Sequence, residues 1–417
     1  MERTTKTKGL WTKDFTKITL TSAISIIGGE IMHLPMSLLV FDETQSTFLA
    51  AFILVCGMLP DILLSIVVAP LIDRGSKKRW IVVLDVLFFL TFAWMGLYTW
   101  RSAFHYGAYV LFTLVESTLA VFYRLAYDAW YPDLIPVGLE QKGFSVAGML
   151  QDSITIVMAP VATILYTLMP IHLLLFISAA TIVLAIFIEA QISVDGKIGT
   201  GEDTMSLQSY FVDLKEGFRY FKKEKGVRNI FTYMSISFST GDGIYVLERT
   251  YFQTTPHLGI TRYGFATSAS MAARLLSGIF LYKKKVPVKK RFAVVKFVYM
   301  ALNVLTGVLL FLPYPLIIAD YAMQGGLGNT SYTLRETATK SYIPAEMRAR
   351  IGAIFNLMIS TAGVLFTLLA GYIGDRIPIR AAVVGFAIFN ALAVILLIYL
   401  PGRVNRPVYE AERTEEV

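Results

Sequence analysis

The apolar residues of this chain are gathered into long blocks, and this grouping constrains the fold more than any other feature. About twenty apolar residues in a helix cross the hydrocarbon core of a bilayer. Twelve blocks reach this length, although some carry charged residues that hydropathy alone would reject. The expected spans are 18–40, 47–72, 80–100, 105–131, 143–168, 171–193, 229–253, 262–281, 292–312, 315–341, 350–373 and 381–400.

The composition agrees with these blocks. The chain is 55% hydrophobic and 16% charged, whereas about a quarter of a soluble domain is charged. The apolar run behind the charged residues 1–17 continues to about Val40 without a small-residue cleavage site, so it predicts a retained first span. We therefore expect an all-α membrane protein, located in the plasma (inner) membrane of a bacterium.

The basic residues predict the orientation. Cytoplasmic loops of membrane proteins carry an excess of Lys and Arg. If the chain starts inside, 28 of its 38 Lys and Arg fall in or at the edge of cytoplasmic segments, and 4 in or at the edge of outer loops. We expect both termini to be cytoplasmic.

One long polar interval, residues 194–228, divides the spans into two sets of six. Its latter part has apolar residues at three- and four-residue steps, which predicts one face of a helix, and basic residues off that stripe. Such a helix lies flat at a membrane surface; the alternative is an ordinary soluble connector. The apolar positions are Leu207, Tyr210, Phe211, Leu214, Phe218 and Phe221, and the basic positions are Lys215, Arg219, Lys222 and Lys223.

The two sets of spans resemble each other in sequence. Glu30 and Asp242 each follow a glycine and lie 212 residues apart, and an Ile-Pro pair ends two spans 208 residues apart, at 135–136 and 343–344. A duplicated six-span unit is typical of a transporter architecture with its substrate site between the halves. We therefore expect twelve transmembrane helices in two pseudo-symmetric six-helix bundles. The predicted parts are an N-terminal bundle (1–193), a cytoplasmic amphipathic linker (194–228), a C-terminal bundle (229–400) and a cytoplasmic tail (401–417).

The loop after the second span, residues 69–79, carries a motif. It reads APLIDRGSKKR, and it resembles the loop motif of the major facilitator superfamily, with Ala69 in place of the leading glycine. The matching residues are Asp73, Arg74, Lys77, Lys78 and Arg79. Leu59-Pro60, Asp85, YPDLIP at 131–136 and LKEGFRY at 214–220 also resemble the drug:proton antiporter branch of macrolide-efflux and siderophore-export proteins.

This resemblance implies a secondary active transporter that exports a lipophilic or cationic small molecule, coupled to protons, by alternating access. The fifth-span antiporter motif is poorly matched, because Ala159 replaces the glycine before Pro160. Uptake of a small solute on the same fold therefore stays an alternative, as does a non-transporting membrane receptor or scaffold. In the loop, we expect Asp73 to accept hydrogen bonds from amides near 350–353, and Arg74 to pair with Asp133.

Other functional classes find no support in the sequence. It has no phosphate-binding loop, no G-x-S-x-G and no metal-ligand spacing, and its one cysteine, Cys56, lies in an apolar block. We expect no enzyme activity, cofactor or metal. The basic residues lie between spans rather than on one soluble face, so we expect no nucleic-acid binding. The expected partners are a small-molecule substrate, protons and the lipid bilayer, and the expected state is a monomer.

Three acids lie centrally in spans, namely Glu30, Asp61 and Asp242. A charge in hydrocarbon is costly, so each should face a partner or a water-filled cavity. A carboxyl desolvated in such a cavity can exchange a proton near neutral pH. Either one of them carries the coupled proton, Glu30 being the first choice, or each is a structural carboxyl held by a local partner.

Further polar residues share helix faces with these acids. Glu116, Arg124 and Asp128 lie on one broad stripe of the fourth span, where Arg124 and Asp128 have the four-residue spacing of an ion pair. Tyr127, in the same span, is expected to line a site for an amphipathic ligand.

In the seventh span, Asp242 and Arg249 share a face with Tyr245 between them. In the tenth, glycines around Gly325 permit either close helix approach or a bend.

Overall fold

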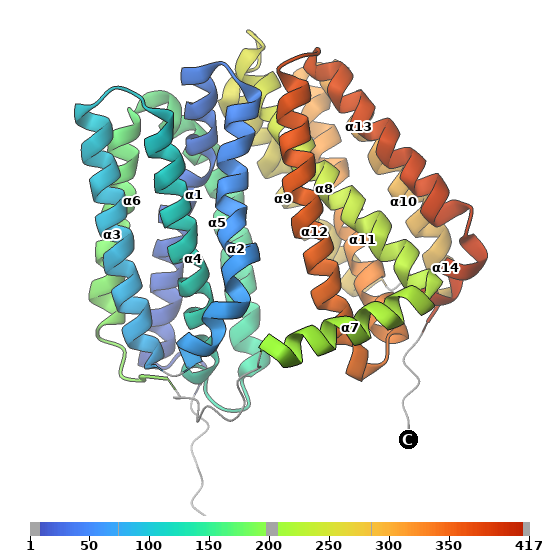
Figure 1. Cartoon of the computed structure of the whole chain (residues 1–417), viewed down its shortest axis with the longest axis horizontal. Helices are drawn as coiled ribbons and strands as arrows, with labels where there is room; N and C mark the ends of the chain where they lie inside the picture. The colour runs from blue at the N-terminus through green and yellow to red at the C-terminus, as the bar shows by residue number, and fades with distance from the viewer. Residues whose placement is uncertain (1–8, 74, 197–206, 285, 412–417) are drawn as a thin grey trace, which may run out of the picture. The chain divides into compact units, whose positions relative to one another are not determined.

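The computed structural model describes residues 9–73, 75–196, 207–284 and 286–411, and these form helices without a β-strand (Figure 1). A 3₁₀ turn (Leu309–Phe311) extends α10, and a π-helical turn (Ile395–Tyr399) extends α13. The helices are α1 (Lys13–Thr44), α2 (Thr47–Asp73), α3 (Lys77–Arg101), α4 (Tyr106–Leu134), α5 (Glu140–Leu168), α6 (Ile171–Glu189), α7 (Leu207–Lys223), α8 (Lys225–Thr254), α9 (Gly259–Lys283), α10 (Val288–Val308), α11 (Tyr314–Tyr342), α12 (Ala345–Gly374), α13 (Ile379–Val394) and α14 (Gly402–Tyr409).

Ten helices in the described part of the chain are long and apolar enough to cross a membrane, so the all-α membrane class is confirmed at this level. The other two long helices are α8 and α11, with 30 and 29 residues. At 1.5 Å per residue each is over 40 Å long, about enough for a bilayer. They are more polar because they carry acids and arginines in their interior, among them Glu248 and Arg335.

The helices divide into two compact units. The first takes α1 up to Leu39, α2 from Cys56 onward, and α3 to α6. The second takes Val40–Val55, which joins the end of α1 to the start of α2, together with α7 to α14. Each unit is described by itself.

In the first unit, α3 packs against α4 and α6, and α1 packs closely on α6. A Cβ atom added at Gly28 would lie 2.2 Å from Thr181 Oγ1. The Ser178 hydroxyl donates to the Gly28 carbonyl at 3.0 Å across the same contact. Small residues at such crossings let helix backbones approach closely within a membrane. Gly28 therefore has a packing role.

The second unit is built on the pairs α9–α11 and α8–α12. A Cβ atom added at Gly325 would lie 2.0 Å from the Ser270 carbonyl oxygen. Of the two roles expected for the glycines in this segment, Gly325 has close helix approach, whereas a Cβ atom added at Gly328 would meet nothing within 4 Å.

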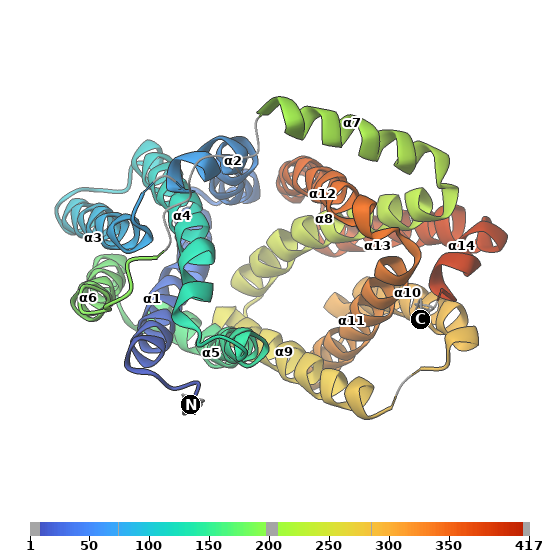
Figure 2. The same ribbon diagram turned by 90° about the horizontal axis from the view of Figure 1, so that it is seen from below.

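The predicted helix in the central polar interval is present as α7, which lies beside α12 across the ends of the second unit's helices (Figures 1 and 2). Gly217 faces α12, where an added Cβ would lie 2.8 Å from Ile354, and Glu216 forms an ion pair with Arg350 at 2.5 Å. Phe221 is buried in the core of the unit, whereas Phe218 is 50% exposed. The predicted stripe is therefore partly covered by protein, and the side chains of residues 207–214 lie outside the described residues.

The turn between α7 and α8 is also anchored. The Tyr342 hydroxyl at the end of α11 donates to Glu224 Oε2 at 3.1 Å. Burial, followed by the nearby Glu224 and Tyr342, raises the pKa of Tyr220 to about 12. Tyr220 is therefore neutral at physiological pH.

The segment expected as a tail continues into α14 as far as Tyr409. Tyr409 is fully buried, and its hydroxyl lies 2.8 Å from that of Tyr299 on α10. Asn405 donates to the carbonyl oxygen of Leu397 at 2.7 Å. These contacts make α14 part of the core of the second unit.

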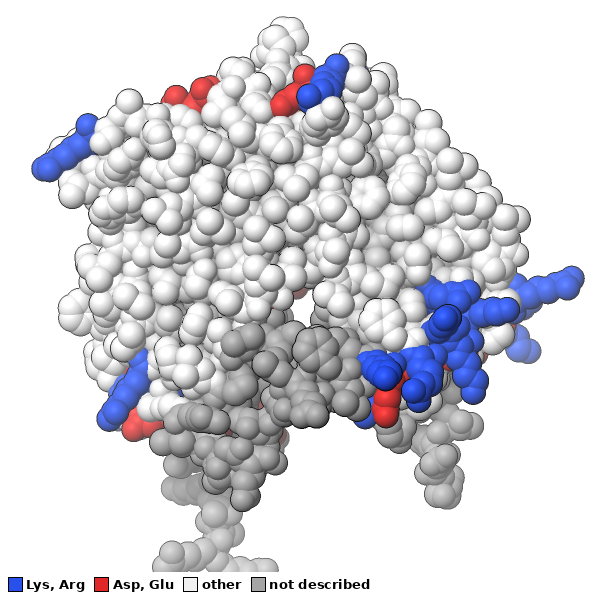
Figure 3. Space-filling model, in the orientation of Figure 1, with Lys and Arg blue, Asp and Glu red and all other residues white. Residues whose placement is uncertain are grey.

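The charged residues lie toward the ends of the helices on the face shown in Figure 3. Between the ends, the surface visible on this face is almost entirely without Lys, Arg, Asp or Glu. A charge-free band is what the hydrocarbon core of a bilayer requires.

Candidate functional site

Glu30 lies near the middle of α1, 17 residues beyond the first residue of the helix. Its side chain is half-buried, and Thr155 of α5 donates a hydrogen bond to Glu30 Oε1 at 3.0 Å. A threonine hydroxyl can donate to a carboxylate but brings no charge, so this contact orients the acid without neutralising it. The side chain of His33, one turn away, lies outside the described residues.

Asp61 has a different environment, because it forms an ion pair with Arg124. Asp61 follows Pro60 on α2, and Arg124 projects from α4 toward it. The side chains are 55% and 50% exposed. The expected pairing partner of Arg124 was Asp128 on its own helix, whereas the ion pair that forms joins two helices.

The remaining predicted residues of α4 lie around this pair. Asp128 is exposed and lies within electrostatic range of Arg124, and Glu116 is half-buried. Tyr127 shares a hydrogen bond with Ser22 of α1 at 2.7 Å, and its ring stacks on Tyr123. Tyr127 is therefore held by α1 and α4 together.

In the second unit, Asp242 lies 17 residues beyond the start of α8, the same position along its helix as Glu30 in α1. Asp242 is exposed, whereas Arg249 is buried with its Cζ atom 3.7 Å from the centre of the Tyr245 ring. Asp242 and Arg249 were expected to share a face of this span with Tyr245 between them, and the guanidinium lies against the Tyr245 ring, where a cation–π contact stabilises it.

Arg335 of α11 is buried among aromatic rings. Its Cζ atom lies 5.3–5.4 Å from the ring centres of Phe238, Tyr332 and Phe355, and it pairs with Glu336 at 2.8 Å. A buried charge needs such partners because its desolvation is costly. This arrangement fits a structural ion pair.

Two clusters of buried acids were not predicted as clusters from the sequence. In the second unit, the Tyr321 hydroxyl donates to Glu248 Oε2 at 2.5 Å, and Gln324 donates to the neighbouring Asp320 at 2.5 Å. Glu248 and Asp320 are 7% and 3% exposed. The available signal was an acid in the interior of a predicted span, which in a membrane protein marks a candidate functional residue.

The second cluster lies in the first unit, where Asp85 of α3, noted from the sequence only for the family resemblance, faces Glu189 at the end of α6. They are 4% and 0% exposed, and the hydroxyls of Thr21 and Tyr123 lie close to Glu189. Neither carboxyl forms an ion pair with a described Lys or Arg. Two buried carboxyls side by side cannot both be ionised without a large energetic cost. No group of three or more His, Cys, Asp or Glu suited to a metal ion occurs among the described residues.

The chain is similar in sequence to a known efflux protein. No family model matches the chain. It is 22% identical over 283 residues to macrolide efflux protein A from Streptococcus pyogenes, which covers 66% of this chain and 69% of that protein. The same protein from the serotype M6 strain matches equally.

The fold has solved counterparts among transporters. A bacterial homologue of the human lysosomal transporter Spinster, in an inward-facing unoccupied conformation, superposes over 95% of this chain and 96% of its own, with a TM-score of 0.60 and 13% identity. The nucleoside transporter NupG covers 92% of this chain and 98% of its own (TM-score 0.69, 12% identity), and a peptide transporter of the POT family covers 93% and 96% (0.65, 13%). The chain resembles the major facilitator transporters. The resemblance to membrane transporters and the ten membrane-length apolar helices together show that the chain is an integral membrane protein.

The loop that carries the major facilitator motif can be followed in part. Ser76 caps the start of α3 by accepting a hydrogen bond from the Arg79 amide at 3.3 Å. Lys77 is buried and donates to the Ile72 carbonyl at 2.9 Å, and Lys78 donates to the Ile192 carbonyl at 2.7 Å. The Ile72 carbonyl lies in the last turn of α2, where the helix dipole favours a cation, and Ile192 lies just beyond the end of α6.

The predicted gating contacts involve Asp73, Arg74 and Asp133. The side chain of Asp73 and all of Arg74 lie outside the described residues, and Asp133 is half-buried. The expected contacts of Asp73 and Arg74 stay predictions.

Proposed function

We propose that the chain is a secondary active transporter that couples proton movement to export of a lipophilic or cationic small molecule by alternating access. In this proposal α1–α6 and α8–α13 are two six-helix bundles and α7 is the linker between them. The excess of basic residues in the expected inner segments supports an orientation in a bacterial plasma membrane with both termini in the cytoplasm.

The observation that carries the proposal is the environment of Glu30. A coupling carboxyl must bind and release a proton during each cycle, so a permanent cationic partner is a disadvantage. Asp61 has such a partner in Arg124, whereas Glu30 accepts a hydrogen bond from the neutral Thr155. The position near the middle of a membrane-length helix also supports Glu30.

Two observations favour a lipophilic or cationic substrate. The similarity to macrolide efflux protein A favours export of a large, partly apolar molecule. The exposed Asp242 and the half-buried Glu30 and Glu116 provide negative charge for a cation. A cationic substrate and a proton would then compete for the same carboxyl.

A second candidate is uptake of a small polar solute. It is favoured by the fold alone, because NupG and the POT transporter share it and are named as nucleoside and peptide transporters. One fold can host many substrates.

The test uses the full chain in proteoliposomes with an imposed pH gradient. Labelled erythromycin, a lipophilic cation, a nucleoside and a dipeptide are offered in turn. The proposal expects movement of one of the first two against its gradient, lost on adding a protonophore. Gradient-driven movement of only the nucleoside or the dipeptide would support uptake, and saturable binding without flux would support a receptor.

A further inference from the structure

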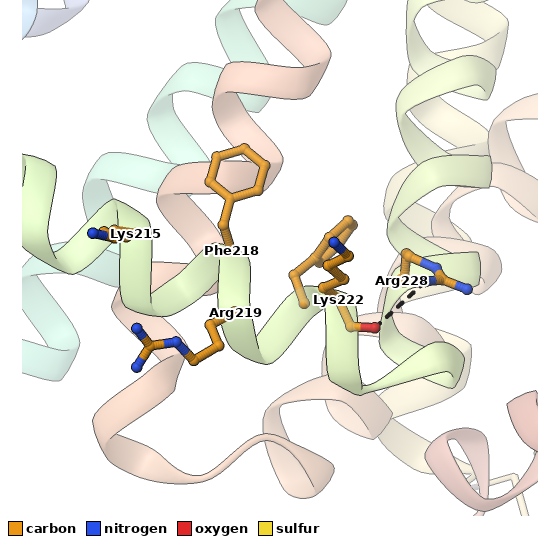
Figure 4. A pocket seen from close by; sticks show the side chains of 6 residues that line it. Lys215, Phe218, Arg219, Lys222 and Arg228 are labelled. Carbon is orange, nitrogen blue, oxygen red and sulfur yellow. Dashed lines mark hydrogen bonds between the residues drawn. The ribbon is translucent and has the colours of Figure 1, made fainter.

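A basic groove of about 410 Å³ lies where α7 meets the start of α8 (Figure 4). All six residues that line it belong to the second unit. Four of them are basic and two are aromatic: Lys215, Phe218, Arg219, Phe221, Lys222 and Arg228.

The register of α7 builds the groove. Lys215, Arg219 and Lys222 follow one another at four- and three-residue steps, so they lie along one side of the helix, and Phe218 lies at the edge of that side. The opposite contact is made by Gly217, which packs on α12 and fixes the rotation of α7.

Arg228 closes one end of the groove. It projects from α8 and donates from Nη1 to the Lys222 carbonyl at 3.4 Å, the dashed line in Figure 4.

The charges of the groove are available to a ligand. Within the described residues, none of the four basic side chains forms an ion pair with a carboxylate; the nearby Glu216 pairs with Arg350 instead. Guanidinium and ammonium groups together favour a phosphate, which Arg can bind through two parallel hydrogen bonds.

The apolar side chains point to the rest of the ligand. Phe221 is 8% exposed and forms the floor, whereas Phe218 is 50% exposed beside the four charges. In Figure 4, Phe218 points upward, toward the level of the membrane-spanning helices, and Arg219 points the opposite way. An exposed phenylalanine at that level is placed to contact an acyl chain.

We propose that this groove binds an anionic phospholipid, with the headgroup attracted by the basic side chains that line the groove and the start of an acyl chain lying on Phe218. The site lies at the end of the membrane-crossing helices, where lipid headgroups are found. Basic residues near a membrane surface attract anionic lipids in this way. The inference needs only an integral membrane protein and does not depend on the transported substrate or its direction.

The test titrates the full chain in detergent with phosphatidylglycerol and counts bound lipid by native mass spectrometry. The triple variant Lys215→Gln, Arg219→Gln, Lys222→Gln should bind about 100-fold more weakly, since each basic residue near the surface contributes on the order of 1 kcal/mol. The matched control is Lys283→Gln, Lys289→Gln, Lys290→Gln, which removes equal charge from exposed positions outside the groove. The control should bind as the wild type does.

Two further arms identify the ligand. Phosphatidylcholine, which has no net charge, should bind much more weakly than phosphatidylglycerol, and soluble glycerol phosphate should not displace the lipid. Phe218→Ser should weaken lipid binding while both charge and folding are kept. Equal loss in the groove and control variants would show a general charge effect and overturn the site, and equally tight binding of glycerol phosphate would overturn the lipid.

Discussion

The carboxylate of Asp375, at the end of α12, caps the start of α2 by accepting a hydrogen bond from the Thr47 amide at 2.5 Å. The same carboxylate accepts from the Ser46 hydroxyl at 2.7 Å and the Phe48 amide at 3.3 Å. The first amides of a helix lack partners within the helix, and the helix dipole favours an anion there. One side chain of α12 therefore does for α2 what a local capping residue does elsewhere.

We expect Asp375→Ala to lower the free energy of unfolding by about 0.5–2 kcal/mol, the usual cost of losing a cap. Thermal unfolding of the purified protein measures this. The control is Arg376→Ala, which removes the neighbouring exposed side chain and should change stability little. Equal stability of Asp375→Ala and the wild type would show that water replaces the carboxylate without loss.

Two phenylalanines of α7 should respond differently to the same substitution. Phe221 belongs to the core of the second unit, so Phe221→Ala should cost about 3–5 kcal/mol of stability. Phe218 is half-exposed, so Phe218→Ala should cost far less. A comparable fall in unfolding temperature for both variants would contradict the packing of α7 described above.

The ion pair between Asp61 and Arg124 should matter more for charge balance than for stability. Each side chain is half-exposed, so breaking the pair should cost about 0–1 kcal/mol. We expect Arg124→Gln to impair transport more than the double variant Asp61→Asn, Arg124→Gln, because the single variant leaves a carboxylate unpaired in the span. Measured transport that is lower in the double variant than in Arg124→Gln would contradict this coupling.

The buried acids Asp85 and Glu189 should tolerate loss of one charge. Glu189→Gln keeps the shape and removes a fully buried acid that faces another, so the variant should be at least as stable as the wild type. Glu189→Ala, which leaves a cavity, should be less stable. A marked fall in unfolding temperature for Glu189→Gln would show that the carboxyl is a required hydrogen-bonding group.

The helices were predicted well from the sequence, because the hydropathy and the length of an apolar run are properties of a single segment of the chain. Each of the twelve expected spans lies within or close to a helix, including the polar helices α8 and α11. The Ile-Pro pairs at 135–136 and 343–344 also hold, since Ile135 and Ile343 end α4 and α11 in the same extended conformation.

The tertiary partners of the polar side chains could not be predicted from the sequence. The ion pair of Asp61 with Arg124 joins residues 63 positions apart, and the cap of Thr47 by Asp375 joins residues 328 apart. Spacing along one helix favoured Arg124 with Asp128, but the choice between the two acids depends on how α2 packs on α4. Glu189 lies only four residues before the expected end of its span at 193, where an acid is expected at the level of the lipid headgroups, so its burial against α3 was not predicted.

The central claim is that Glu30 carries the coupled proton, and Glu30→Gln tests it most directly. The variant keeps the shape and the hydrogen bond with Thr155 but removes the titration. In proteoliposomes with an imposed pH gradient, we expect gradient-driven transport to be lost while substrate binding and downhill exchange persist. Asp61→Asn and Asp242→Asn, measured alongside, should keep gradient-driven transport. Full gradient-driven transport by Glu30→Gln, with loss in either of the other two variants, would assign the proton to that residue and contradict the account.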